Sequence, residues 1–287
     1  MIVIYKQFDI LPKEYIENKI NEYLAEDGAS SDYTTIYTVP QDTEITAVLE
    51  AEEEFVFAGK SIIEVIFKEC KVEILINDGD RVKAGTTMAK IIGNASYILT
   101  RERVMLNIIQ RLSGIATTTR KYVDAVKDYD VHVYDTRKTT PGMRLFQKYA
   151  VRIGGAYNHR YNLESDILIK DNHIAAAGGV TNALQNIFDK MKNKKINIEL
   201  EVVSIEQIIE GLKFDINGIL LDNMKPENVK KCVEFIRNSP NGGNIFIEAS
   251  GGINYNTIVD YAKTGVDGIS VGALTHNIKS SNMHLVF

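Results

Sequence analysis

Six short apolar runs in the second half of the chain each end at a polar or glycine-rich cluster. The runs occupy residues 131–134, 167–169, 196–200, 218–221, 245–249 and 268–271. The stretches between them have apolar positions at helical spacing, as in residues 143–151, 180–191, 205–212, 226–236 and 255–263. Strands that alternate with helices predict a parallel α/β sheet or barrel. Because the pattern supplies six strands and not eight, an incomplete parallel α/β barrel fits best.

The first half of the chain has a different pattern. Residues 13–25 show the spacing of a helix, whereas residues 44–51 and 72–76 are strand-like and residues 81–92 are β-rich with a turn at Gly85. From Tyr97 to Val126 the spacing is helical again, and Gly114 is expected to break this segment into two helices. We therefore place a domain boundary at this glycine, with domains at residues 1–114 and 115–275.

Composition and charge exclude several classes of protein. The 287 residues are 45% hydrophobic and 25% charged, which is typical of a globular protein with a real core. The net charge of −5 argues against general nucleic-acid binding. No apolar stretch approaches the roughly 20 residues of a membrane span, and Met1–Tyr5 is too short for a signal sequence. The two cysteines, Cys70 and Cys232, are expected to be free thiols in a reducing cytoplasm.

Positive charge is concentrated just after the first of the six runs. Residues 136–163 contain no Asp or Glu but hold six Lys or Arg side chains. We assign Arg144, Lys148 and Arg152 to a solvated helix face. The others, Arg137, Lys138 and Arg160, together with His159, stand at strand ends or in loops. Since arginine binds carboxylates and phosphates through two parallel hydrogen bonds, these four residues predict a site for a multiply anionic substrate.

Acidic residues end two successive strands. Glu201 and Asp222 lie next to this basic site in the predicted fold, and their carboxylates suggest Mg²⁺ that bridges to phosphates. The alternative is that they form salt bridges with the basic residues. Glu199 should point to the same face as Glu201, and alternation alone does not decide which of the two is functional.

Glycines end the last two strands, at Ser250-Gly251-Gly252 and at Gly272-Ala273. Barrels often bind phosphate in these loops, where backbone N–H groups can approach an anion closely, although simple tight turns would have the same sequence. Residues 268–272 also match the G-x-S-x-G pattern of serine hydrolases. Because Ser270 lies inside the apolar run and not on a turn after it, we reject that interpretation.

These motifs, in this order, resemble the quinolinate phosphoribosyltransferase family. The resemblance extends over nearly the whole chain. Its specific pieces are residues 102–107, 111–117, 135–142, 148–152, 158–160, 168–173, 248–252 and 270–276. The family usually has a third glycine where this chain has Ala156, and the early loop at residues 31–35 and the tail at residues 280–283 also depart from its pattern.

The resemblance implies a fold and a reaction. The fold would be an N-terminal α/β sandwich, which the tail at residues 276–287 rejoins, followed by an open α/β barrel. The reaction would join quinolinate and phosphoribosyl pyrophosphate, with Mg²⁺ as cofactor, to give nicotinate mononucleotide, pyrophosphate and CO₂. The protein would be a cytoplasmic homodimer with a shared active site, which could assemble further into a hexamer.

The resemblance also implies roles for individual residues. Catalytic roles fall to Lys138 at the pyrophosphate, to Lys170, and to Glu201 and Asp222 at the ribose hydroxyls and Mg²⁺. The residues that would bind substrate are Arg103 from the partner subunit, Thr136, Arg137, His159, Arg160, Ser250, Gly251, Gly252, Gly272 and Ala273. Two other functions compete with this one: a paralogous phosphoribosyltransferase that acts on a different aromatic acid, and a non-catalytic phosphosugar-binding module.

Overall fold

The computed structural model describes residues 5–191, 195–240 and 242–287, and the chain divides into two compact units. The first, here called the barrel unit, contains Tyr5–Gln7, Lys121–Thr140 and Ala156–His276. The second, the sandwich unit, contains Phe8–Arg120, Pro141–Gly155 and Asn277–Phe287. The two units thus alternate along the chain, and the division predicted near residue 114 stays a prediction.

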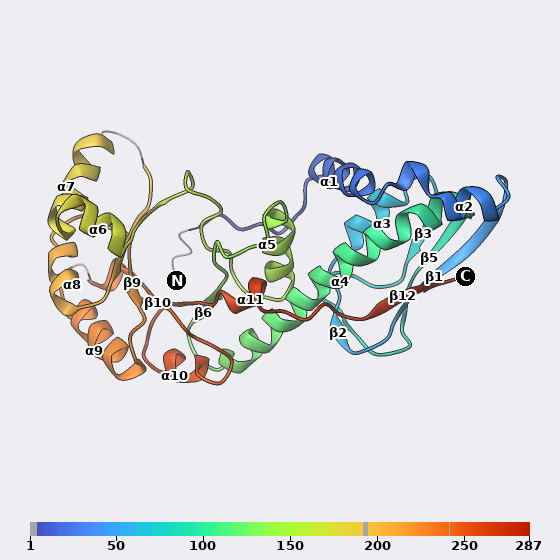
Figure 1. Ribbon diagram of the computed structural model, residues 1–287. Helices are drawn as coiled ribbons and strands as arrows, with labels where there is room; N and C mark the ends of the chain where they lie inside the picture. The colour runs from blue at the N-terminus through green and yellow to red at the C-terminus, as the bar shows by residue number, and fades with distance from the viewer. Residues whose placement is uncertain (1–4, 192–194, 241) are drawn as a thin grey trace. The chain divides into compact units, whose positions relative to one another are not determined.

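A six-stranded parallel sheet forms the centre of the barrel unit, and each of its strands was predicted from an apolar run (Figure 1). In spatial order the strands are β6 (His132–Tyr134), β11 (Gly268–Ser270), β10 (Phe246–Ser250), β9 (Gly218–Asp222), β8 (Ile198–Val202) and β7 (Ile167–Ile169). Among the described residues the edge strands β6 and β7 do not pair with each other, so the barrel is open. The predicted fold class is therefore confirmed.

Side chains alternate between the two faces of these strands. Leu200, Ile219 and Ile247 lie on one face and are completely buried. Glu201 pairs with Leu220, and Leu220 pairs with Glu248, so these three side chains share the opposite face. That second face is the interior of the open barrel, and it carries the polar residues described below.

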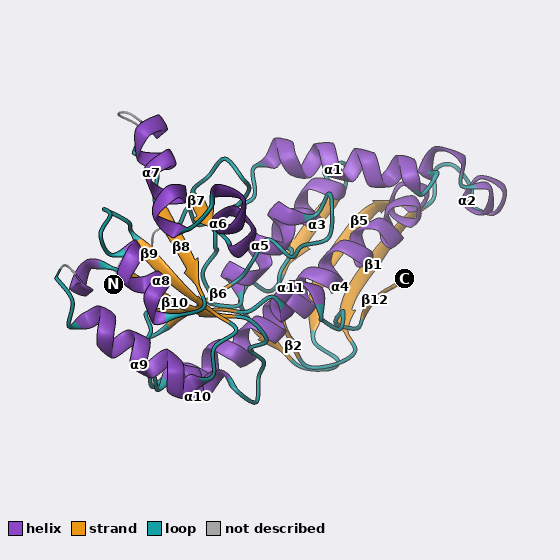
Figure 2. Cartoon of the chain, turned by 60° about the vertical axis from the view of Figure 1, so that its left-hand side comes forward, coloured by secondary structure: helices purple, strands orange, loops and turns teal. Residues whose placement is uncertain are grey.

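Helices follow the strands, and all but the last of them lie on the outer side of the sheet (Figure 2). They are α6 (Asp171–Ala177), α7 (Val180–Met191), α8 (Ile205–Gly211), α9 (Pro226–Arg237), α10 (Ile258–Ala262) and α11 (Ala273–His276). The polar cluster after β7 begins a helix, since Asp171 and Asn172 belong to α6. Its main-chain geometry is fixed by His173, whose Nδ1 accepts the Lys170 N–H at 2.9 Å.

The sandwich unit is built on an antiparallel sheet. Its strand order is β12 (Met283–Val286), β1 (Glu44–Ala51), β5 (Thr87–Asn94) and β3 (Lys71–Ile74), so the tail of the chain pairs with β1. A separate pair of short strands joins β2 (Phe55–Val56) to β4 (Arg81–Val82). The helices are α1 (Lys13–Glu26), α2 (Tyr33–Thr38), α3 (Lys60–Ile66), α4 (Ala95–Val126, which continues into the barrel unit) and α5 (Arg144–Ile153).

Two expectations about this region were wrong. Gly114 does not break a helix, because α4 is continuous from Ala95 to Val126. A Cβ at Gly114 would lie 2.2 Å from the carbonyl oxygen of Lys279, so this glycine allows the tail to pack closely against α4. Lys148 is not on a solvated helix face either, since α5 buries it completely.

The helices in the described part of the chain are all too short or too polar to cross a membrane. Cys70 and Cys232 are both free thiols.

Candidate functional site

A cavity of about 560 Å³ opens at the carboxyl ends of the parallel strands. All of its lining residues belong to the barrel unit. The predicted site residues among them are Thr136, Arg137, Lys138, His159, Arg160, Lys170, Glu201, Asp222, Ser250, Gly251, Gly252, Gly272 and Ala273. The fold therefore brings together side chains that are separated by up to 137 residues in the sequence. Arg103 lies on α4 in the sandwich unit, and its predicted role stays a prediction.

Two arginines supply positive charge to this cavity. Arg160 donates from Nη1 to the main-chain oxygen of Asp166 at 3.0 Å. The Nε atoms of Arg160 and Arg137 are buried and have no hydrogen-bond partner among the described residues. Burial lowers the pKa of Arg160 from its ordinary value, and the nearby charge of Arg137 lowers it further. Two guanidinium groups close to one another, one of them desolvated, favour an anion with more than one negative charge.

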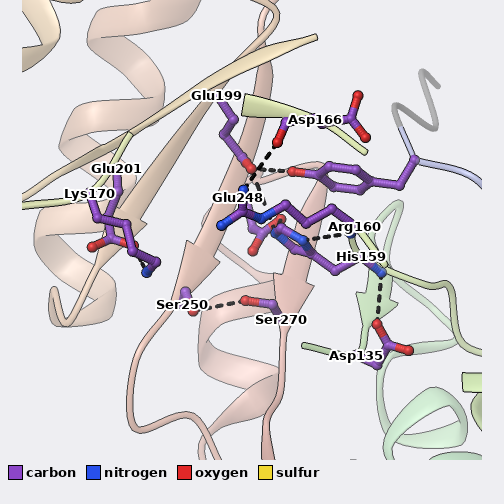
Figure 3. A network of polar contacts seen from close by, with 11 residues as sticks. Asp135, His159, Arg160, Asp166, Lys170, Glu199, Glu201, Glu248, Ser250 and Ser270 are labelled. Carbon is purple, nitrogen blue, oxygen red and sulfur yellow. Dashed lines mark hydrogen bonds and ion pairs between the residues drawn. The ribbon is translucent and has the colours of Figure 1, made fainter. Parts of the chain in front are cut away.

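Asp135 holds the loop that carries His159 and Arg160. Its carboxylate is fully buried and accepts a hydrogen bond from Asn158 Nδ2 at 2.8 Å. It also accepts one from the main-chain N–H of His159 at 2.8 Å (Figure 3). Because β6 ends immediately before Asp135, these bonds fix the loop directly to the sheet. Asp135 thus orients the two basic side chains without lining the cavity.

Acidic side chains occupy another part of the cavity wall. Glu201 lies at the end of β8 with its side chain only 8% exposed, and one of its oxygens accepts from Lys170 Nζ at 2.5 Å. Asp222 ends the neighbouring strand β9, is half-buried, and accepts from Asn223 Nδ2 at 2.5 Å. The salt-bridge alternative for Glu201 is thus realised with Lys170. Both carboxylates still line the cavity and offer the oxygen ligands that Mg²⁺ prefers.

Glycine loops form the wall at the ends of β10 and β11. Gly251 has φ of +91°, and a Cβ there would lie 2.3 Å from Asn223 Oδ1 and 2.7 Å from its main-chain nitrogen. Gly252 has φ of +65° and faces open space. This geometry leaves the backbone accessible to a ligand, as a phosphate-binding loop requires. Within the wall, Ser270 donates to Ser250 between the two Oγ atoms at 2.8 Å, which gives Ser270 a structural role.

Lys138 is held at the rim by its main chain. Its N–H donates to Thr136 Oγ1 at 3.1 Å, and its carbonyl oxygen accepts from Thr275 Oγ1 at 2.7 Å. The aliphatic part of the side chain passes Gly272, where a Cβ would lie 3.1 Å from Lys138 Cδ. The exposed ammonium group can therefore move over the cavity while the backbone stays fixed.

A buried polar cluster forms the floor of the cavity, and we define it as Tyr5, His159, Glu199 and Glu248 (Figure 3). His159 Nε2 lies 3.6 Å from Glu199 Oε2 and 3.6 Å from Glu248 Oε2. Burial raises the pKa of Glu199 to about 7, and burial together with Glu199 raises the pKa of Glu248 well above its usual range. Two carboxyl groups this close and this deeply buried favour a shared proton over two negative charges.

The same three side chains, His159, Glu199 and Glu248, have ligand atoms that all lie within 4.8 Å of one another. Such a group could in principle hold a cation. However, Glu199 already accepts a hydrogen bond from the Tyr5 hydroxyl, and raised carboxyl pKa values account for the close approach. We therefore treat the floor as a hydrogen-bonded cluster.

Sequence reasoning missed Tyr5, Glu248 and Asn223. Glu248 precedes Ser250 by two residues on β10, so strand alternation alone would have placed it on the interior face. Asn223 has a positive φ of 53°, which is rare outside glycine and marks its tight contact with the Gly251 loop. Tyr5 is separated from Glu199 by 194 residues, and no local pattern predicts this contact.

Comparison with known proteins agrees with this architecture. The model for the quinolinate phosphoribosyl transferase C-terminal domain matches residues 115–286, and the model for the N-terminal domain matches residues 32–113. The probable nicotinate-nucleotide pyrophosphorylase (carboxylating) of Bacillus subtilis is 39% identical over 274 residues, which cover 94% of this chain and 92% of the relative. A chloroplastic enzyme of the same name from Arabidopsis thaliana is also 39% identical, over 91% of this chain and 80% of its own.

A solved structure has the same fold. The nicotinate-nucleotide pyrophosphorylase from Francisella tularensis superposes with a TM-score of 0.89 at 37% identity, and the match covers 98% of each chain. Both domain models and relatives of nearly full length thus agree with the motifs and with the open barrel. The chain belongs to the quinolinate phosphoribosyltransferase family.

Proposed function

We propose that the protein transfers a phosphoribosyl group from phosphoribosyl pyrophosphate to quinolinate and releases pyrophosphate and CO₂. The product is nicotinate mononucleotide, as in the de novo synthesis of NAD. One observation carries this proposal. The guanidinium groups of Arg137 and Arg160, whose Nε atoms are buried, share a cavity with glycine loops and with the carboxylates of Glu201 and Asp222. Such a cavity suits a planar dicarboxylate beside a phosphorylated sugar.

Quinolinate carries two adjacent carboxylates, and each needs a donor. In the proposed complex Arg137, His159, Arg160 and Lys170 bind them. Each charge-assisted hydrogen bond contributes about 1.5–3 kcal/mol. Nicotinate lacks the second carboxylate and would leave part of this positive charge buried without a partner, so the site discriminates against it.

Phosphoribosyl pyrophosphate occupies the rest of the cavity. The loops at Ser250–Gly252 and Gly272-Ala273 bind its 5′-phosphate through main-chain N–H groups. Glu201 and Asp222 bind the ribose hydroxyls and hold Mg²⁺, and their oxygen donors fit this ion. When bound, Mg²⁺ neutralises charge on the pyrophosphate. Lys138 reaches the same leaving group from the rim.

The residues of this chain act by positioning and by electrostatic stabilisation. The ring nitrogen of quinolinate forms a bond to C1 of the ribose as the bond from C1 to the pyrophosphate oxygen breaks. The ring becomes a pyridinium, whose positive nitrogen stabilises the electron pair that stays on the adjacent carbon when the carboxylate there departs as CO₂. A proton then takes the place of the lost carboxylate. Arg137, Arg160 and Lys170 hold the ring so that its nitrogen faces C1, and Lys138 balances the charge that grows on the leaving group.

A paralogous phosphoribosyltransferase that acts on another aromatic acid is the second candidate. That group tends to lose the Asp before the Thr-Arg-Lys motif and the Lys-Asp-Asn-His run. Here Asp135 is present and buried beneath the basic loop, and residues 170–173 are intact. Quinolinate is therefore the substrate that we favour.

The decisive experiment is an assay of the purified protein with phosphoribosyl pyrophosphate and either quinolinate or nicotinate, followed by pyrophosphate release and CO₂ release. We expect both products with quinolinate and neither with nicotinate. Pyrophosphate release with nicotinate alone would overturn the substrate assignment. Omission of Mg²⁺ tests the metal: activity should fall with EDTA and return when Mg²⁺ is added in excess.

We further propose that the protein acts in the cytoplasm as a homodimer in which the partner subunit's Arg103 completes the site. Helix α2 exposes three large side chains, Tyr33, Ile36 and Tyr37, which suits an interface. The test mixes two impaired variants, Arg103→Ala and Arg137→Lys. If subunits share a site, exchange of subunits restores activity, because some mixed dimers regain one intact site. If Arg103 acts within its own subunit, each mixed dimer instead pairs two defective subunits, and no activity returns.

A further inference from the structure

The first described residues of the chain, Tyr5 to Gln7, lie in the barrel unit although the next residues belong to the sandwich unit. Gln7 holds this segment in place. Its Oε1 accepts the Asn158 N–H at 2.7 Å, and its Nε2 donates to the Asn158 carbonyl oxygen at 3.0 Å. One side-chain amide thus satisfies both main-chain groups of the residue that directly precedes His159.

Tyr5 contacts His159 and Glu199 from the same position. Its ring stacks on the His159 imidazole with centroids 4.2 Å apart and an angle of 23° between planes. Its hydroxyl donates a hydrogen bond to Glu199 Oε2. Burial and the two glutamates raise the pKa of Tyr5, so the hydroxyl keeps its proton and remains a donor.

The remaining contacts of His159 define its orientation. The main-chain N–H of Arg160 donates to His159 Nδ1 at 2.8 Å, so the ring proton is placed on Nε2. Nε2 lies 3.6 Å from the carboxylates of Glu199 and Glu248, beyond normal hydrogen-bond length. Tyr5, and not His159, is therefore the close donor to Glu199. His159 itself lines the cavity that the proposed function assigns to quinolinate.

We propose that Tyr5 is a positioning residue for quinolinate: it fixes the plane of His159 by stacking and occupies Glu199, so that the imidazole is held toward the substrate and not drawn down to the buried carboxylates. This inference rests on the proposed function for the identity of the ligand. It assigns a role in the substrate site to a residue at the start of the chain, 154 residues before His159.

Two substitutions separate the two contacts of Tyr5. Tyr5→Phe keeps the ring and removes the hydroxyl, so Glu199 loses its close donor and attracts His159. Tyr5→Leu removes both contacts. Tyr134→Phe is the matched control, because Tyr134 packs edge-on against Tyr5 with centroids 6.4 Å apart and its buried hydroxyl has no hydrogen-bond partner among the described residues.

Steady-state kinetics is the first readout. We expect Tyr5→Phe to raise the KM for quinolinate about threefold to tenfold, Tyr5→Leu to raise it more, and the KM for phosphoribosyl pyrophosphate to stay within about twofold. A purely structural role would lower the melting temperature and the amount of active enzyme without this selectivity. The control should match the wild type. A quinolinate KM within twofold of wild type in Tyr5→Leu, or in Tyr5→Phe if the leucine variant does not fold, would overturn the proposal.

The second readout does not depend on turnover. Long-range ¹H–¹⁵N NMR correlations of the His159 ring, assigned with His159→Gln, should show a protonated Nε2 in the wild type and shifted signals in both Tyr5 variants but not in Tyr134→Phe. Unchanged signals in Tyr5→Phe and Tyr5→Leu would refute the positioning role whatever the enzyme does. A wild type that is inactive with quinolinate but shows the expected NMR changes would instead refute only the proposed function.

Discussion

The wall and the floor of the cavity are built from the same strands, but the acidic side chains in them have different surroundings. On β8, Glu201 faces the wall with Lys170 at 2.5 Å, whereas Glu199 faces the floor with its side chain only 1% exposed. On β10, Ser250 belongs to the wall and Glu248, which is completely buried, to the floor. A step of two residues along β8 thus changes a carboxylate paired with a lysine into one that belongs to the buried cluster.

Because of this difference, we assign separate roles to the wall and to the floor. Side chains of the wall can approach a charged ligand at little cost, because solvent and opposite charges already compensate them. Carboxylates of the floor cannot both ionise without a large desolvation penalty, so they are suited to holding other groups in place. We expect substitutions in the wall to affect turnover and binding most strongly, and those in the floor to change the dependence of stability on pH.

The largest effect should come from Lys138→Met. Loss of a single cation at a developing negative charge typically lowers kcat by about 10²–10³. We expect a decrease of that size with little change in the KM for quinolinate, as measured by pyrophosphate release. Lys263→Met is the control, since Lys263 is exposed on the same unit and pairs with Asp260. A near-normal kcat in Lys138→Met would remove this residue from the chemistry.

Next in size is Arg137→Lys. One ammonium group cannot reproduce the two parallel hydrogen bonds of a guanidinium, so we expect kcat/KM for quinolinate to fall by about 10- to 100-fold. Arg152→Lys on α5 makes the same chemical change at an ion pair with Asp9 and should remain within about twofold of wild type. If both variants lower kcat/KM for quinolinate by the same factor, the buried Nε of Arg137, which has no hydrogen-bond partner among the described residues, does not mark a binding site.

The two glycines of the phosphate loop allow a smaller and sharper test. Gly251→Ala combines an unfavourable φ with a clash against Asn223, whereas Gly252→Ala has only the unfavourable φ. We expect Gly252→Ala to cost about 1–2 kcal/mol of stability and Gly251→Ala to cost more. Gly251→Ala should also raise the KM for phosphoribosyl pyrophosphate further. Thermal unfolding and kinetics measure the two effects, and equal costs at both positions would contradict the tight contact with Asn223.

The smallest effect concerns Glu248→Gln and pH. The pKa of Glu248 in the folded protein lies well above its ordinary value of 4.5. Its protonated form therefore favours folding below about pH 4.5, and this contribution is lost as the pH rises toward the folded pKa. Glutamine stays neutral, so the melting temperature of the variant should fall less between pH 5 and pH 8 than that of wild type. Each kcal/mol corresponds to about 2–4 °C. Parallel curves would mean that Glu248 is ionised in the folded state.

Much of the wall could be predicted from the sequence, because its residues follow apolar runs and the carboxyl ends of parallel strands meet at one edge. Lys170, Glu201, Asp222 and Ser250 were found in this way, and the structure brings them into one cavity. The six strands and most of the helices were predicted from the same periodicity. Alternation also placed Glu199 and Glu201 on one face of the sheet. It does not show which of them lines the cavity wall and which lies deeper, in the floor, and this position is what distinguishes them.

The remaining features depend on contacts between residues far apart in the sequence, which no local pattern predicts. Gly114 was interpreted through its low helix propensity, but the close approach of Lys279 explains it better. Lys148 was assigned to a solvated face because it is charged and lies in a predicted helix, yet it is completely buried. Tyr5 was missed in the floor because it reaches Glu199 only through the tertiary fold.

The double hydrogen bond between Gln7 and Asn158 also bears on how this protein can be divided for experiments. A fragment that begins at residue 115 keeps every parallel strand but loses Tyr5 and Gln7. In such a fragment the ring of Tyr5 would no longer stack on His159. The main-chain N–H and carbonyl oxygen of Asn158 would also lose their hydrogen bonds to Gln7. A fragment cut at the boundary between the two family domains would therefore have an impaired quinolinate site. This would hold even if the fragment folded and still bound the sugar phosphate.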